Sequence, residues 1–101
     1  MDYGSFDTAL KAAAGDDNAL IIELRSTFVE SAKRQLSLLS RSRCDANWQY
    51  TSWRLNGLAA SFGAVRLMEL ADEASEGAPG DPVVIRKLGE AITEIETHDI
   101  P

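Results

Sequence analysis

The sequence predicts an all-α protein: an up-down antiparallel four-helix bundle preceded by a short extra N-terminal helix. Apolar residues recur at three- and four-residue steps through most of the chain, which is the spacing of one helix face. Glycine, proline and capping aspartate interrupt these stretches at short intervals, and short connections favour antiparallel neighbours. No segment shows the alternation of apolar and polar residues that is typical of a half-buried strand.

The first two helices have recognisable ends in the sequence. We expect a short helix that begins near Ser5, as its N-cap, and ends at Gly15, because glycine adopts the left-handed conformation of a helix end. A long helix over about residues 17–42 follows, and either Asp16 or Asp17 is its expected N-cap. Its predicted buried row, at steps of about four residues, is Leu20, Leu24, Phe28, Ala32, Leu36 and Leu39.

Three further helices are expected in the rest of the chain. The first two cover about residues 45–62 and 64–76, with Gly63 between them, and a Gly-Ala-Pro-Gly loop at residues 77–80 follows. Asp81 and Pro82 then begin the last helix, because aspartate caps free N–H groups and proline fits the first turn. The inward residues predicted for the last two helices are Leu67, Leu70, Ala71, Ala74, Val84, Leu88, Ala91 or Ile92, and Ile95.

Length and composition favour one ordinary globular domain over residues 1–101, with 45% hydrophobic and 26% charged residues. A net charge of −6 disfavours nucleic-acid and membrane-surface binding, and Arg41, Arg43 and Arg54 form too sparse a basic patch to change that expectation. The sequence shows no signal peptide and no apolar run of membrane-spanning length, so we expect a cytoplasmic location. Cys44 is the single cysteine, and no motif indicates a metal or cofactor site.

The helix expected at residues 45–62 has an unusual outer face. At about 100° per residue, with Leu55 at the centre of the buried side, Trp53 lies about 160° away and points into solvent. Charged and polar residues normally cover the outer face of a bundle helix. The residues predicted to point inward are Trp48, Thr51, Ser52, Leu58, Ala59 and Phe62, and those predicted on or at the edge of the outer face are Tyr50, Asn56, Gly57 and Ala60.

Three interpretations of this outer face remain open. Exposed Tyr50 and Trp53 beside small residues are typical of the anchors of a protein interface. Alternatively, the first helix or the N-terminal MDYG segment folds over the two rings. A slight rotation of the helix, finally, buries Trp53 at the boundary of the core.

The segment of residues 53–64 resembles the signature of histidine phosphotransfer (HPt) domains. That signature reads His-x-Leu-Lys-Gly, then five variable and mostly small residues, then Gly-Ala, and Leu55, Gly57, Gly63 and Ala64 match it in register. The resemblance extends on both sides over nearly the whole chain. It implies a helical bundle whose third helix presents the phosphate-accepting face to the receiver domain of a response regulator or to a related kinase domain.

Two positions depart from the signature. Trp53 occupies the phosphoacceptor position, and an indole N–H is a donor without a basic lone pair to attack phosphorus. Asn56 occupies the position of the family lysine and brings no positive charge, although phosphoryl transfer depends heavily on charge stabilisation. The single histidine, His98, lies outside the motif near the end of the chain.

We therefore expect a pseudo-HPt signalling protein of a two-component phosphorelay, and not an enzyme. It binds a receiver or histidine kinase domain without accepting phosphate, and its predicted partner-binding residues are Tyr50, Trp53, Asn56, Gly57 and Ala60. One alternative is a self-associating helical module with a two-fold contact through Tyr50 and Trp53. Another is a functional phosphotransfer protein with an unrecognised acceptor. No catalytic residue, metal or cofactor is expected, and neither nucleic acid nor membrane is an expected partner.

Overall fold

The computed structural model describes residues 3–98, which form five α-helices and contain no strand. This confirms the all-α class. The helices are α1 (Gly4–Ala14), α2 (Asn18–Ser40), α3 (Asp45–Ser61), α4 (Val65–Glu76) and α5 (Pro82–Thr97). Each boundary lies within two residues of the expected one, apart from the end of α5, for which the sequence predicted no residue.

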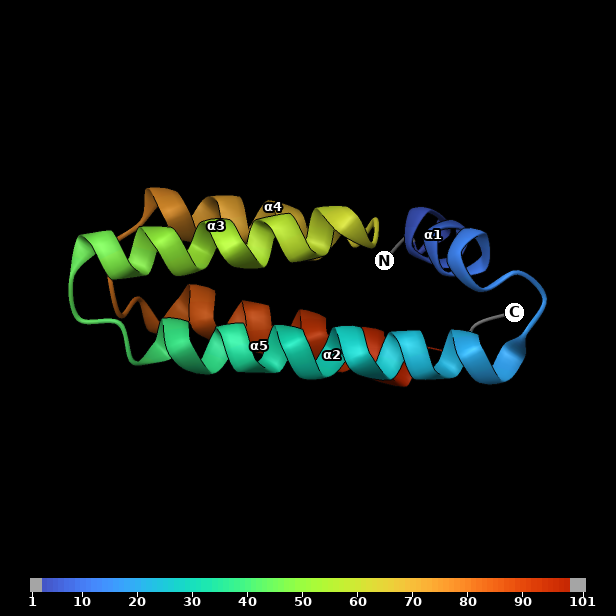
Figure 1. Ribbon diagram of the computed structural model, residues 1–101. Helices are drawn as coiled ribbons and strands as arrows, with labels where there is room; N and C mark the ends of the chain where they lie inside the picture. The colour runs from blue at the N-terminus through green and yellow to red at the C-terminus, as the bar shows by residue number, and fades with distance from the viewer. Residues whose placement is uncertain (1–2, 99–101) are drawn as a thin grey trace.

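The four longer helices lie along the long axis of an elongated molecule (Figure 1), whose extents are 44 × 20 × 17 Å. α2 packs against α3 and α5, and α4 packs against the same two helices. α1 packs against α2 and lies at one end of the molecule, close to where the described chain begins and ends (Figure 1). α3 therefore contacts its neighbours along two sides, and its remaining side faces outward.

One apolar stripe of each helix builds the core. The inward residues predicted for α4 and α5 are all buried. In α3, Trp48, Leu55 and Ala59 are buried together with two polar residues, while Leu58 and Phe62 are partly buried. The buried polar residues of α3 are Thr51 and Ser52.

The buried row predicted for α2 is wrong at its N-terminal end, and two of its other members, Leu24 and Leu36, are only partly buried. Leu20 is 37% exposed, and Ile21 is buried in its place at 5%. Because the α-helix has 3.6 residues per turn, every four-residue step rotates a side chain by about 40° away from the starting direction. Two such steps from Phe28 carry Leu20 to the edge of the core, whereas the seven-residue step to Ile21 preserves the direction.

Local capping chemistry sets several helix ends as predicted. The Asp17 Oδ1 atom accepts a hydrogen bond of 3.1 Å from the backbone N–H of Leu20. The Asp81 Oδ1 atom accepts one of 2.9 Å from the N–H of Val83, and proline follows at the first helical position. Gly15 ends α1 with a φ of 65°, a conformation that suits glycine.

Ser5 is not the N-cap of α1, contrary to the prediction. The helix begins at Gly4, and Tyr3 occupies the cap position without a side-chain hydrogen bond. The Tyr3 ring stacks on His98, with 3.7 Å between ring centroids and 15° between planes. A contact with the opposite end of the chain, which sequence spacing cannot reveal, therefore holds the start of α1.

The turn between α3 and α4 packs closely against the start of α1. Gly63 has a φ of 66°, and a β-carbon at this position would lie 2.7 Å from the backbone oxygen of Ser5. Three aromatic rings continue the contact, since Phe28 lies 5.5 Å from Phe6 and 4.8 Å from Phe62 between centroids. The glycine is therefore required both by its conformation and by the close approach of α1.

Candidate functional site

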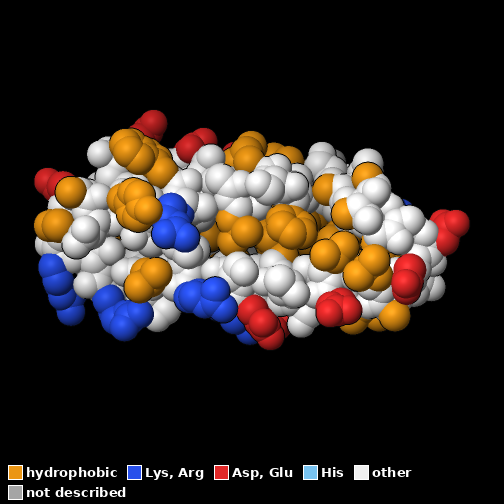
Figure 2. Space-filling view, in the orientation of Figure 1, with side chains coloured by type: hydrophobic (Ala, Val, Ile, Leu, Met, Phe, Trp, Pro, Cys, Tyr) orange, Lys and Arg blue, Asp and Glu red, His pale blue; other side chains and the backbone are white. Residues whose placement is uncertain are grey.

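The outer face of α3 is exposed as the helix geometry predicts. Tyr50 is 57% exposed and Trp53 is 58% exposed, and both stand among the other surface side chains (Figure 2). Gly57 and Ala60 are exposed as well, whereas Asn56 is partly buried. Within residues 3–98, neither α1 nor a rotation of α3 covers Trp53, so the structure contradicts both of those alternative interpretations for the described chain, while the first two residues of the MDYG segment lie outside the described residues.

Tyr50 is held in place by its neighbour one turn further on. The Arg54 Nη1 atom lies 3.5 Å from the Tyr50 hydroxyl oxygen and donates to it. The guanidinium carbon lies 5.7 Å from the centre of the ring, a cation–π arrangement worth about 0.5–1 kcal/mol at an exposed site. Trp53 has no hydrogen-bond or ring partner within residues 3–98, so its indole is available to another molecule.

Asn56 has a role inside the molecule that sequence reasoning missed. Its Nδ2 atom donates to the backbone oxygen of Met68 at 3.1 Å and to Asp72 Oδ1 at 2.9 Å. Both amide N–H groups are thus used to join α3 to α4. Only the amide oxygen remains for a partner, and the exposed carboxylate of Asp72 adds a negative charge at the edge of the face. Nothing in the spacing of the sequence indicated this pairing.

Gly57 faces open space. A β-carbon added there would meet no atom within 4 Å beyond its own helix, so packing inside the molecule does not require glycine. Glycine in a helix interior costs about 1 kcal/mol relative to alanine. The position therefore leaves the backbone of α3 accessible one turn after Trp53, at a cost that the fold itself does not explain.

Two other nucleophilic side chains among the described residues, His98 and Ser61, are engaged in contacts within the molecule. His98 Nε2 lies 3.1 Å from Asp7 Oδ1, its ring stacks on Tyr3, and Arg25 donates to its backbone oxygen. Ser61 Oγ donates to the backbone oxygen of its own helix at Gly57. Among residues 3–98 there is no group of three or more His, Cys, Asp and Glu side chains suited to a metal ion.

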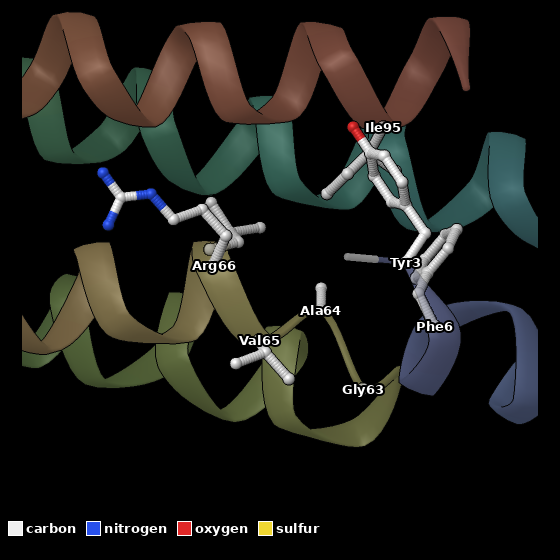
Figure 3. Close-up of a pocket in the computed structure, with 8 residues that line it drawn as sticks. Tyr3, Phe6, Gly63, Ala64, Val65, Arg66 and Ile95 are labelled. Atoms are coloured by element: carbon white, nitrogen blue, oxygen red, sulfur yellow. The ribbon is translucent and has the colours of Figure 1, made fainter. Parts of the chain in front are cut away.

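A small pocket lies apart from this face, at the junction of α1 with the bundle (Figure 3). Its lining is mostly apolar and includes Phe6, Ala64 and Ile95, while the charged end of Arg66 points away from the rings of α1. Burial raises the pKa of the neighbouring Tyr3 phenol above its ordinary value of 10.0, and the carboxylates of Glu94 and Asp7 add to the effect. The pocket serves the docking of α1 and offers little polar chemistry for recognition.

Comparisons with known protein families, with curated proteins and with solved structures find no match for this chain. Its function must therefore be argued from its own residues. No helix within residues 3–98 combines the length and the apolar character needed to span a membrane. The feature of the described chain that most needs a functional explanation is the exposed indole in the middle of α3.

Proposed function

We propose that this chain is a pseudo-HPt protein of a two-component phosphorelay, which binds a receiver or histidine kinase domain and accepts no phosphoryl group. The proposal includes an up-down four-helix bundle of the HPt type, a location in the cytoplasm, and no catalytic activity. Tyr50, Trp53, Gly57 and Ala60 form the contact surface, and Asn56 lies at its edge with one free oxygen.

The packing of the longer helices supports the bundle. α2 contacts α3, α3 contacts α4, α4 contacts α5, and α5 contacts α2. Because the connections between them span only a few residues, neighbouring helices are expected to run in opposite directions. α3 then presents its outer face between α2 and α4, as the resemblance to HPt domains implies.

The single observation that carries the functional proposal is Trp53 at the phosphoacceptor position with 58% of its surface exposed. Large exposed aromatic side chains are common anchors of protein interfaces, and an indole cannot act as a phosphoryl acceptor. The position of the family lysine also supplies no positive charge, since Asn56 is neutral and its amide is bound to the carboxylate of Asp72. A phosphoryl group needs positive charge at this place.

Two measurements on purified domains test the proposal. Titration of receiver and histidine kinase domains from the same host should give saturable binding, and Trp53→Ala should weaken it about 30-fold or more, the loss typical of an interface hot spot. Incubation with a phosphorylated receiver should leave the wild-type chain unlabelled. Absence of binding to every such domain, or an acid-labile phosphohistidine on the wild type, would reject the proposal.

Restoring the missing groups gives a sharper test. The double variant Trp53→His with Asn56→Lys returns a nucleophile and a positive charge to an exposed helix face. If the face docks as an HPt domain does, this variant should take a phosphoryl group from a receiver that leaves the wild type unlabelled. The matched control is Tyr50→His, which places a histidine on the same face one turn away and should stay unlabelled.

The same exposed rings favour one competing function, self-association. Tyr50 and Trp53 at 57% and 58% exposure are also suited to a two-fold contact between copies of the chain. Light scattering at rising protein concentration distinguishes the two proposals. A dimer that Trp53→Ala dissolves would support self-association, whereas a monomer at all concentrations for both proteins would exclude it.

A further inference from the structure

The charge of the molecule is unevenly distributed, although its net value is −6. Along α2, exposed Glu23 and Glu30 precede exposed Arg34, and the C-cap of the helix is Arg41. Arg and Lys side chains gather over this part of the surface, at the lower left of the view, and surround hydrophobic side chains, while acidic groups lie towards the α1 end and also along the upper left edge (Figure 2). One face of an acidic protein is therefore basic.

Four arginines make this face basic: Arg34, Arg41, Arg43 and Arg54, all of them exposed. None of the four forms an ion pair with a carboxylate within residues 3–98. In contrast, the cations of the other faces are mostly paired, with Lys33 bound to Glu96 at 2.8 Å and Lys87 near Glu73 at 3.7 Å. The positive charge on this face thus remains available for another molecule.

An apolar side chain and a groove lie between the arginines of α2 and the outer face of α3, which carries Tyr50 and Trp53. Leu38 is 43% exposed and lies on α2 one turn after Arg34. It lines a groove between α2 and α3 together with Arg41, Ser42, Asn47 and Thr51. Arg54, which stacks on Tyr50, follows Thr51 on the same side of α3. The surface is therefore continuous from the second half of α2 to Trp53.

We infer that the docking surface of this chain extends from Trp53 and Tyr50 across the groove onto Leu38 of α2, and that its four arginines select a partner with an acidic protein surface. This inference rests on the proposed function, which supplies the partner class, and adds the chemistry and the second helix that recognise it. Trp53 and Leu38 supply apolar contacts, and the surrounding arginines steer an acidic partner during the encounter.

The alternatives with phosphate groups fit this surface less well. Nucleic acids and anionic membranes present extended negative charge, which the acidic remainder of this chain repels. Glu30 precedes Arg34 by one turn and Asp45 begins α3 near Arg43, so carboxylates border the basic face. A protein partner of limited acidic area avoids these borders, and it also offers the apolar pocket that Trp53 requires.

Charge reversal on α2 tests the inference with the receiver or kinase domain that binds best. We expect Arg34→Glu with Arg41→Glu to slow association about tenfold or more at low salt, because steering changes association rates by about 10–1000-fold. The matched control is Lys11→Glu with Arg86→Glu, which changes the net charge equally on α1 and α5 and should change the rate less than twofold. Raising the salt concentration should slow wild-type association and leave the α2 variant almost unchanged.

The outcomes separate this inference from the proposed function. If Trp53→Ala weakens binding but the α2 variant behaves like its control, the docking surface does not reach α2 and only the inference fails. If the wild type binds no receiver or kinase domain, the proposed function fails and the inference with it. Tighter binding to a DNA duplex or to phosphatidylglycerol vesicles than to any acidic domain would also overturn the inference. Circular dichroism of each variant confirms that the fold is kept.

Discussion

The two tryptophans of α3 lie in opposite environments, one in the core and one on the surface. Trp48 is 1% exposed, and its indole N–H donates to the backbone oxygen of Ala74 at 2.6 Å. Trp53 is 58% exposed and has no such partner within residues 3–98. The inner ring joins α3 to α4 and leaves no polar atom unsatisfied. The outer ring makes no such contact with the core, and in the proposed function its apolar surface contacts the partner domain.

Two glycines of residues 53–64, the segment that resembles the HPt signature, also differ in whether the fold requires them. Gly63 is required by the structure, since its φ is positive and the backbone of α1 lies against it. Gly57 is required by nothing in the described chain, because a β-carbon would fit there without contact. The fold thus explains the glycine at one end of the segment, whereas only the proposed contact surface gives a reason for the other.

Alanine substitution of the two tryptophans should give the largest difference in the free energy of unfolding. We expect Trp48→Ala to lower the free energy of unfolding by about 3–5 kcal/mol, the range for large aromatic residues in a core. Trp53→Ala should change it by no more than about 0.5 kcal/mol, as for other exposed positions. Urea unfolding followed by circular dichroism measures both. Equal losses for the two variants would show that Trp53 is part of the core.

Gly63→Ala should produce the next largest effect. We expect a loss of about 2 kcal/mol, because a left-handed conformation costs about 1–2 kcal/mol for residues other than glycine and the new methyl group meets backbone atoms of Ser5. The control is Gly80→Ala, which has a φ of 82° but open space around its β-carbon position. It should show the conformational cost alone, so a larger loss for Gly80→Ala would contradict the close approach of α1.

Gly57→Ala should have opposite effects on the two measured properties, stability and partner binding. We expect the free energy of unfolding to rise by about 0.5–1 kcal/mol from helix propensity, while binding to the receiver or kinase domain weakens. Gly89→Ala on α5 is the matched control, since its β-carbon would meet Leu36 of α2 at an ordinary contact distance of 3.7 Å. A stabilised Gly57→Ala protein with unchanged affinity would remove Gly57 from the proposed contact surface.

The smallest expected effect concerns Tyr3, at the junction of α1 with the bundle and away from the outer face of α3. Burial raises the pKa of Tyr3, so the folded protein keeps this proton at a pH where the unfolded chain loses it. The stability from this group is therefore complete below pH of about 10 and is lost as the pH rises through the folded-state pKa. Tyr3→Phe should reduce the alkaline loss of stability in urea titrations between pH 9 and pH of about 11.

Much of the fold follows from local chemistry that the sequence displays. Helices begin at Asp17 and at Asp81 with Pro82, and α1 ends at Gly15, as capping rules predict. Each of these residues acts on backbone groups only a few residues away. The buried stripes of α4 and α5 and the outward direction of Trp53 follow from helix periodicity in the same way. These features need no knowledge of which helices are neighbours.

The remaining features depend on contacts between residues far apart in the chain, and only the tertiary structure decided them. Tyr3 occupies the N-cap position of α1 with its ring stacked on His98, and Asn56 joins α3 to α4 because Asp72 lies opposite. The basic face likewise needed α2 and α3 side by side, since Arg34 and Leu38 are distant in sequence from Tyr50. Periodicity specifies the direction of each side chain from its own helix, whereas the partner that it meets depends on how the helices pack.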